Sequence, residues 1–340
     1  MIAKQVFAIV LLLTSVIGSI GNALLLWIIL SDNYLNKKPS FIIIASLTWC
    51  ACLGALTYGL NYFFYSFMPN TISDYKLCII FGMLNEITFL SHSLHMFTLA
   101  LNRCLVMGCS YNSKLRKLFS LKSTISLLIF IWITSIFMRV WHLYVGGVAI
   151  LPSLFACFIN YNNFIPVIFK VHLVWQYSNI TATGLFYIYI FILLKRQRKN
   201  LESLSDSSIT TTPKDPKFKT SCITTVTGLD SHSVHSENRK IEIANKGNNL
   251  NILLFRRKIS TSERKKRERD IIYYAVALFG IYMFDTIYFT FQKFFPLDFN
   301  IYTSFISYIY CLIFASNSIL SFFCMSMFRQ KIIELTKKFF

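Results

Sequence analysis

Seven long apolar segments, separated by stretches rich in Gly, Pro, Asn and charged residues, run through this sequence. We place them at roughly residues 6–30, 41–67, 76–107, 121–145, 167–194, 270–294 and 301–324. Each has at least the ~20 residues that a helix needs to cross a hydrocarbon layer of about 30 Å. The composition agrees, since 55% of the residues are hydrophobic and only 14% are charged. The sequence therefore predicts an all-α membrane protein, a seven-transmembrane helix bundle within the lipid bilayer.

The positive charges predict the orientation of this bundle. If the N-terminus lies outside, 28 Lys and Arg residues fall on the inner loops and tail, and only four fall on the outer side. Cytoplasmic loops carry such an excess, so we predict a multi-pass plasma-membrane protein with an extracellular N-terminus and a cytoplasmic C-terminus. The net charge of +19 then reflects this topology and nearby anionic lipid, not nucleic acid. The first helix is expected to act as its own insertion signal.

Composition also divides the chain into regions. Residues 1–194 contain helices one to five, and residues 270–328 contain helices six and seven. Between them, residues 195–269 replace apolar residues by Ser, Thr, Lys, Asn and Asp, so we predict a largely disordered third cytoplasmic loop whose basic ends extend the flanking helices. Residues 329–340 alternate apolar and basic positions, which predicts a short amphipathic helix along the inner membrane surface.

Two of the nine cysteines fall on the predicted outer side. Cys78 opens the third helix, and Cys157 lies in the loop between helices four and five. The other seven fall in lipid or on the cytoplasmic side, where thiols stay reduced. An oxidising outer compartment disfavours the alternative of two unpaired thiols, so we predict a disulfide between Cys78 and Cys157 over the end of the bundle.

Polar and ionisable side chains also occur inside the outer halves of three segments. They are Asn85 and Glu86 in the third segment, Arg139 and His142 in the fourth, and Tyr282 and Asp285 in the sixth. An intramembrane ionisable residue is by default a candidate functional residue, so we predict that these six line a ligand-binding cavity. Glu86 and Arg139 come from neighbouring helices, and the alternative for this pair is mutual neutralisation.

Several short motifs follow one another along the segments. They are GN at residues 21–22, LNRC at residues 101–104, Trp132, and NSILSFFCMSMFR at residues 317–329. In their order and spacing the chain resembles rhodopsin-like G-protein-coupled receptors, and the resemblance covers all seven helices. Arg103 lies 25 residues after Cys78, the distance at which that family has its DRY-type triplet.

The resemblance implies partners and roles. Arg103 matches the arginine that contacts the C-terminal helix of a G-protein α subunit, and Tyr187 resembles the fifth-helix tyrosine that steadies it. Asn102 takes the place of the neighbouring acid, and Asn317 matches the asparagine of the seventh-helix motif. The implied partners are a heterotrimeric G protein and a small-molecule or peptide ligand from outside. Asn85 stands where amine receptors have an aspartate, which disfavours a biogenic amine.

The chain also departs from the family pattern. Asn102 cannot form the acid's ion pair with the adjacent arginine, and Ala51 stands where the second helix carries a sodium-binding aspartate. Ser318 and Ser321 replace the proline and tyrosine of the seventh-helix motif, and helix six lacks the expected Trp and Pro. Such departures, with abundant Phe, Tyr and Ile, are similar to the chemoreceptors of nematodes. They predict a weakened resting restraint on Arg103.

Other functional classes have less support in the sequence. A retinal protein needs a lysine in helix seven, and residues 301–324 contain none. The sequence has no HExxH, paired CxxC or Gly-rich phosphate loop, and we interpret His92 and His95 as packing residues, so we predict neither an enzyme nor a metal or cofactor site. The remaining alternative is a seven-helix ligand-gated channel or transporter, which would show an inverted orientation or related halves.

Overall fold

The computed structural model describes residues 2–68, 75–108, 119–146, 148–151, 156–159, 166–209, 266, 268–284, 287 and 299–339. The chain divides into two compact units. One unit comprises Met1–Leu193 and Asp270–Phe340, and the other comprises Leu194–Arg269. The first unit contains the helix bundle, and the sites described below belong to it.

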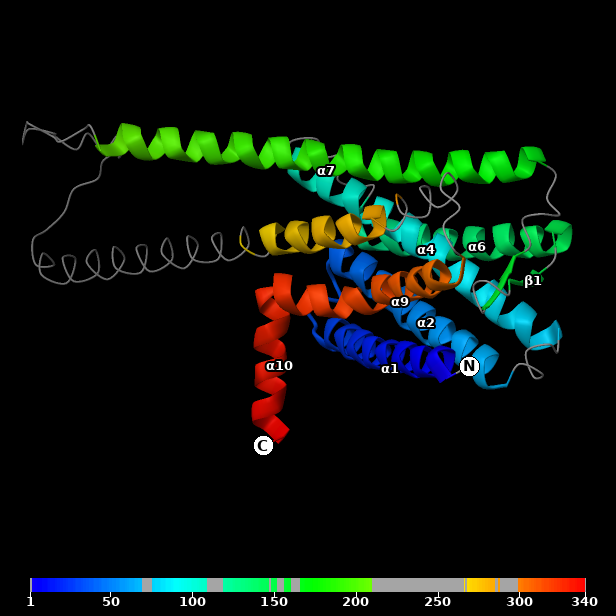
Figure 1. Ribbon diagram of the computed structural model, residues 1–340. Coiled ribbons are helices and arrows are strands. Elements are labelled where there is room, and N and C mark those ends of the chain that lie inside the picture. Colours follow the sequence, from blue (N-terminus) through cyan, green and yellow to red (C-terminus); the bar gives the residue numbers. More distant parts are fainter. Residues whose placement is uncertain are drawn as a thin grey trace, which may run out of the picture. The chain divides into compact units, whose positions relative to one another are not determined.

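Among the described residues, seven long helices run wholly or partly through the first unit, as the sequence predicts. They are α1 (Ile2–Ser31), α2 (Pro39–Phe67), α4 (Tyr75–Gly108), α6 (Leu121–Gly146), α7 (Pro166–Ile209), the helix of residues 268–284, and α9 (Phe299–Cys324). A shorter helix, α10 (Ser326–Phe339), follows α9 directly. The predicted fold class, a seven-helix bundle with a short eighth helix, is confirmed (Figure 1). The last part of the predicted sixth segment, beyond residue 287, lies outside the described residues.

Among the described residues, four helices are by themselves long and apolar enough to span a membrane. They are Gln5–Ser31, Pro39–Phe67, Leu121–Trp141 and Val174–Arg196. The pair Cys311–Cys324 and Ser326–Glu334 also passes the same test together, with a bend of 87°. α4 is more polar because its buried face carries groups such as Asn85, His92 and Arg103, which the surrounding helices shield. The chain is a multi-pass membrane protein.

Helices α1, α2 and α9 approach one another closely at small residues. A Cβ atom on Gly18 of α1 would lie 2.6 Å from the Ala315 Cβ of α9, and one on Gly59 of α2 would lie 2.3 Å from the Ser15 Oγ of α1. Small residues let membrane helices approach backbone to backbone and gain dispersion contacts. These three helices therefore form a closely packed group.

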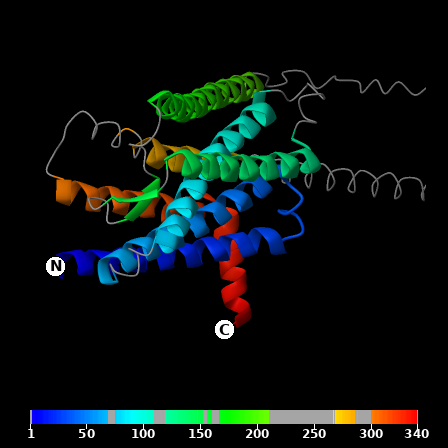
Figure 2. The same ribbon diagram turned by 90° about the vertical axis from the view of Figure 1, so that its right-hand side faces the viewer.

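The bundle has two distinguishable ends. At one end a short hairpin pairs β1 (Val148–Leu151) with β2 (Ala156–Ile159) in antiparallel register, with Ile150 opposite Cys157. This hairpin contacts α2, α4 and α6, and the sequence analysis did not predict it. At the other end α10 turns away from α9 and runs crosswise to α1, as Figures 1 and 2 show. We refer to these as the hairpin end and the α10 end.

Candidate functional site

Arg103 lies at the α10 end of α4 and is almost completely buried, with 1% of its surface exposed. Tyr187 of α7 is also buried and lies within electrostatic range of both Arg103 and Tyr274. The neighbouring Tyr189 is exposed, so the register of α7 directs Tyr187 and not Tyr189 into the bundle. The Tyr187 hydroxyl has no hydrogen-bond partner in the described part of the chain. The structure thus places Tyr187 within electrostatic range of Arg103, and their joint role in coupling stays a prediction.

Asn102 is held by α2. The Ser40 hydroxyl donates a hydrogen bond of 2.7 Å to the Asn102 side-chain oxygen. Ser40 lies at the start of α2, immediately after Pro39, which fits the first turn of a helix because proline has no amide hydrogen to leave unpaired. The Asn102 side-chain oxygen therefore accepts a bond that connects α4 to α2.

Asn317 is the centre of a buried polar network that connects four helices. Its side-chain nitrogen donates to Asn22 Oδ1 of α1 at 2.8 Å and to Thr48 Oγ1 of α2 at 3.2 Å. Its oxygen accepts a hydrogen bond from the Tyr274 hydroxyl of the 268–284 helix. Asn22 also donates to the Phe314 carbonyl at 3.0 Å. A satisfied network of this kind fixes how helices are rotated against one another, because each lost bond would leave a buried polar group.

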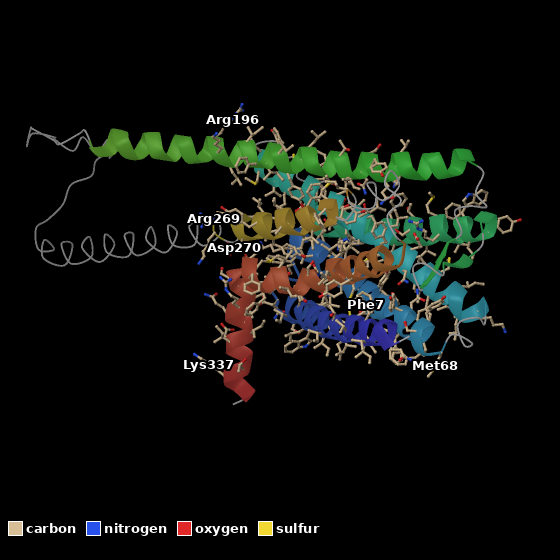
Figure 3. All side chains as sticks on the ribbon, viewed as in Figure 1. Phe7, Met68, Arg196, Arg269, Asp270 and Lys337 are labelled. Carbon is tan, nitrogen blue, oxygen red and sulfur yellow. The ribbon has the colours of Figure 1, made fainter. Side chains whose placement is uncertain are left out.

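Two acidic residues outside α9, Asp270 and Asp32, bind residues of α10. Asp270, which begins the bundle part of the 268–284 helix, accepts from the Ser326 hydroxyl at 2.7 Å and from the Ser326 amide at 3.2 Å. Figure 3 shows Asp270 beside the start of α10. Farther along α10, the Lys331 ammonium lies 3.3 Å from an Asp32 oxygen, in the turn between α1 and α2.

The Asp32–Lys331 pair shifts the pKa of both groups. Burial alone would raise the pKa of Asp32, but hydrogen bonds from the Tyr34 and Leu35 amides and from Lys331 lower it below its ordinary value of 3.8. The pKa of Lys331 is raised above 10.5, first by its hydrogen bond to Glu334 and then by the bond to Asp32. Both groups are therefore charged over the whole physiological range.

The two histidines of α4 lie in different environments. The Trp132 indole donates to Ser46 Oγ at 3.1 Å, and Ser46 lies 2.7 Å from His95 Nε2. His95 Nδ1 contacts the Ser91 carbonyl, which can only accept, so Nδ1 carries the proton and Nε2 accepts from Ser46. His92 is fully buried against the Phe314 ring, with no hydrogen-bond partner for either ring nitrogen among the described residues.

In the hairpin-end half of the bundle, the predicted ligand-binding residues form two sets of contacts. Arg139 of α6 and Glu86 of α4 form an ion pair of 3.1 Å, with side-chain exposures of 1% and 11%. Asn85 accepts a hydrogen bond of 2.9 Å from Thr57 of α2, while its side-chain nitrogen has no partner in the described ranges. The pairing of Glu86 with Arg139 is the alternative that the sequence analysis left open.

Tyr282 is buried inside the bundle, whereas two other predicted ligand-binding residues fall outside the described part of the chain. The Tyr282 ring is buried, with its centroid 5.7 Å from that of Phe89 and 6.1 Å from that of His92. The side chain of His142 and all of Asp285 lie outside the described residues. In the part of the chain that the structure describes, no group of three or more His, Cys, Asp or Glu residues could hold a metal ion.

The side chains of Cys78 and Cys157 also lie outside the described residues. Their backbones belong to α4 and β2, two elements in contact with one another. Four other cysteines among the described residues, Cys50, Cys52, Cys311 and Cys324, are free thiols.

Comparisons with known proteins bear on this arrangement. No family model matches the sequence, and no curated protein matches it. Among solved structures, the crystal structure of squid rhodopsin matches over 98% of this chain and 85% of its own, with a TM-score of 0.65 and 13% sequence identity. The chain has the fold of rhodopsin. At this identity the likeness establishes the helix arrangement, and the residues must carry any argument about function.

Within the rhodopsin fold, several residues that the sequence analysis did not single out connect the helices. Ser40 and Thr48 supply hydroxyls from α2, and Tyr274 and Asp270 supply polar groups from the 268–284 helix. One signal was available, because positions 270, 274 and 282 recur at multiples of four and therefore lie near one face of a helix. The two α2 hydroxyls carried no comparable signal, since Ser and Thr are common in membrane helices.

Proposed function

We propose that this chain is a receptor of the rhodopsin-like G-protein-coupled type, which transmits the binding of a small-molecule or peptide ligand from outside to a heterotrimeric G protein. Its role would be chemosensory. The rhodopsin fold supports the proposal, and the observation that carries it is the burial of Arg103 at the α10 end of α4. No enzymatic or metal-dependent activity is part of the proposal.

A buried guanidinium is costly in a membrane protein and marks a functional position. Tyr187 of α7 lies within electrostatic range of Arg103 and also of Tyr274, which belongs to the 268–284 helix. A partner that inserts the C-terminal end of a helix presents free carbonyls and a negative partial charge. Arg103 can donate to such carbonyls, and the Tyr187 hydroxyl can orient the guanidinium. In this proposal Asn102, held by Ser40, and Asn317 keep α4 and α9 in position for coupling.

The test is nucleotide exchange by purified G proteins on receptor reconstituted in lipid nanodiscs. Because Asn102 cannot form the ion pair of the family's acid, we expect ligand-independent exchange to be measurable with at least one G-protein class. Arg103→Ala should abolish this exchange. Lys37→Ala, which removes an exposed cation from the α1–α2 turn at the same end of the bundle, should leave it unchanged. Undiminished exchange in folded Arg103→Ala receptor would contradict the coupling role.

A second part of the proposal concerns the ligand. We propose that Asn85, Glu86, Arg139, His142, Tyr282 and Asp285 line the cavity that takes it. The free Asn85 nitrogen can donate to a ligand acceptor, and the Glu86–Arg139 pair can exchange one partner for a charged ligand group. An agonist found by screening should lose potency on Asn85→Ala with normal surface expression. Lost expression with unchanged potency would make these residues structural.

We also propose that Cys78 and Cys157 form a disulfide at the hairpin end. The contact between α4 and β2 supports this, because the two cysteines belong to those elements. The bond would fix the hairpin to the bundle and stabilise the fold by roughly 2 to 4 kcal/mol. Peptide mass mapping of unreduced protein should recover the two cysteines linked, and recovery of both as free thiols would reject the pairing.

The orientation in the plasma membrane is the remaining part of the proposal. The excess of Lys and Arg on one side favours an extracellular N-terminus and a cytoplasmic C-terminus. An epitope at Met1 should be labelled on intact cells, and one inserted after Ser208 only after permeabilisation. The reverse pattern would favour an inverted ligand-gated channel.

A further inference from the structure

The junction between α9 and α10 places two sets of unpaired backbone groups next to each other. α9 ends at Cys324, α10 begins at Ser326, and the two helices are bent by 87°. The last carbonyls of a helix and the first amides of the next have no partners within their own helices. A sharp bend of this kind therefore needs side chains that satisfy both sets.

Three of the last carbonyls of α9 have partners within the junction, beginning with the Ser321 carbonyl, which accepts from the Met325 amide. Arg329 donates to the Phe322 carbonyl at 3.4 Å and also to the Phe323 carbonyl. A cation at the carbonyl end of a helix is favourable for the helix dipole as well. Arg329, the cationic residue in the first turn of α10, is thus bonded to carbonyls of α9.

In the amide set, Phe328 donates to the Met325 carbonyl within the junction, whereas the Ser326 amide is satisfied from another helix. The first turn of α10 contains no acidic residue. Asp270 of the 268–284 helix supplies the carboxylate instead, and a single oxygen accepts both from the Ser326 amide and from the Ser326 hydroxyl. A carboxylate in this position satisfies an amide and interacts favourably with the positive end of the helix dipole.

The same face of the 268–284 helix makes a second bond to α9. Tyr274 lies four residues after Asp270, one helical turn away, and its hydroxyl donates to Asn317. The end of this helix is therefore attached to the α9–α10 segment at two successive turns. Any movement of that end away from α9 must break the Asp270–Ser326 bonds together with, or before, the Tyr274–Asn317 bond.

We propose that Asp270, although it belongs to a different helix, caps the N-terminus of α10. The order of the first turn of α10 then depends on the position of the 268–284 helix. When that helix end lies against α9, α10 is capped. When it moves outward, α10 loses its cap and its first turn frays. The next step rests on the proposed function. Binding of a G protein beside Arg103 requires space between these helices, and it therefore uncaps α10.

The resting-state test needs no ligand or G protein. Amide hydrogen exchange is followed by mass spectrometry for residues 326–329 in nanodisc-reconstituted protein. Asp270→Ala should speed exchange there about fivefold, the effect of losing a helix cap. Asp270→Asn should give a smaller increase, since its amide oxygen can still accept. Glu334→Gln, which removes an acid from the exposed part of α10, should change nothing at residues 326–329 and serves as the matched control.

A double-mutant cycle separates capping from general loosening. If Asp270 acts through Ser326, the effects of Asp270→Ala and Ser326→Ala on exchange should be less than additive. Additive effects, or exchange that is unchanged in Asp270→Ala, would overturn the capping role. Should Asp270→Ala fail to fold, Asp270→Asn and Ser326→Ala carry the same comparison.

The second arm adds a purified heterotrimeric G protein without nucleotide. Bound receptor should show faster exchange at residues 326–329 than free receptor, and this increase should be absent in Asp270→Ala, where the turn is already uncapped. If no G protein binds while the resting-state arm succeeds, the proposed function fails and the cap remains. If a G protein binds and exchange at residues 326–329 stays the same or slows, the coupling is overturned.

Discussion

The two sides of the bundle are packed in different ways. On one side α1, α2 and α9 meet backbone to backbone, and a Cβ on Gly18 would lie 2.8 Å from the Ala315 Cα. On the other side α7 and the 268–284 helix meet through side chains, as in the Tyr187–Phe279 pair with centroids 5.4 Å apart. A Cβ on Gly184 of α7 would lie 3.4 Å from Phe279 Cζ, which is an ordinary van der Waals contact.

This difference has a mechanical consequence. Backbone contacts cannot be re-formed after a small displacement, because there is no side chain whose rotamer can adjust. Aromatic side chains can repack over a range of helix positions. We therefore infer that α1, α2 and α9 form a fixed group, against which α7 can shift, and against which the 268–284 helix can shift once its bonds to Ser326 and Asn317 break.

The strongest test of the comparison is a pair of glycine substitutions. Gly18→Ala should destabilise the protein by about 3 kcal/mol or prevent folding, because the new Cβ would overlap the α9 backbone. Gly184→Ala on the other side should leave the melting temperature within a few degrees of the wild type, because its Cβ would make an ordinary contact of 3.4 Å with the Phe279 ring. Thermal unfolding in detergent measures both. Equal losses would remove the distinction between the two sides.

Replacement of hydrogen-bonding asparagines should give the next largest effect. Asn317→Ala removes the hydrogen bonds that Asn22, Thr48 and Tyr274 make to Asn317 in a buried site. We therefore expect the free energy of unfolding to fall by about 2 to 3 kcal/mol. Asn179→Ala on α7 removes a single 2.7 Å bond to Ser93 and should cost about 1 kcal/mol. Thermal unfolding measures both losses of stability. A greater loss for Asn179→Ala than for Asn317→Ala would contradict the assignment of α1, α2 and α9 as the fixed group.

His92 and His95 test the boundary between the two sides. His92 faces Phe314 of α9 and Tyr282 of the 268–284 helix, with both ring nitrogens unpaired among the described residues, so His92→Phe should raise stability by about 1 kcal/mol. His95→Phe should lower stability by about 1 to 2 kcal/mol, since it leaves Ser46 without its acceptor. The prediction is that the two variants change the free energy of unfolding in opposite directions. A loss of stability in both variants would indicate that His92 has a polar partner in solution.

The same two histidines show how far the sequence predicts the structure. Segment length and hydrophobicity predicted the seven helices, since these are local properties of the chain. Whether a buried polar residue is satisfied depends on the rotation of a neighbouring helix, so His92 and His95 look alike in sequence. The Asp270–Ser326 contact depends on an 87° bend between α9 and α10, which no local pattern encodes. The hairpin of residues 148–159 was missed because its strands are only four residues long.

The Glu86–Arg139 pair was partly predictable for a related reason. Two opposite charges in adjacent membrane helices have a strong tendency to pair, because each alone is costly in lipid. The sequence could therefore identify both partners, and the 3.1 Å contact agrees with one of the two interpretations offered. It could not show whether Asn85 points to Thr57 or to the cavity, and the structure shows its oxygen bonded to Thr57.

The smallest expected effect concerns the contact that ties α10 to the fixed group. Asp32 and Lys331 are both partly exposed, with side-chain exposures of 21% and 39%, so solvent screening limits their pair to at most ~1 kcal/mol. Lys331→Met should therefore change the melting temperature little. In the exchange experiment on α10 it should also have far less effect on residues 326–329 than Asp270→Ala.

The pH dependence of this pair follows from the two shifted pKa values. The pKa of Asp32 is lowered, so its contribution is present above 3.8 and is lost only as the pH falls below that value. The pKa of Lys331 is raised, so its contribution is present below 10.5 and is lost only at higher pH. Exchange in the second half of α10, corrected for intrinsic rates, should thus be constant from about pH 5 to 9. A change near pH 6 to 7 would show that a titrating histidine, and not this pair, controls how α10 is attached to the α1–α2 turn.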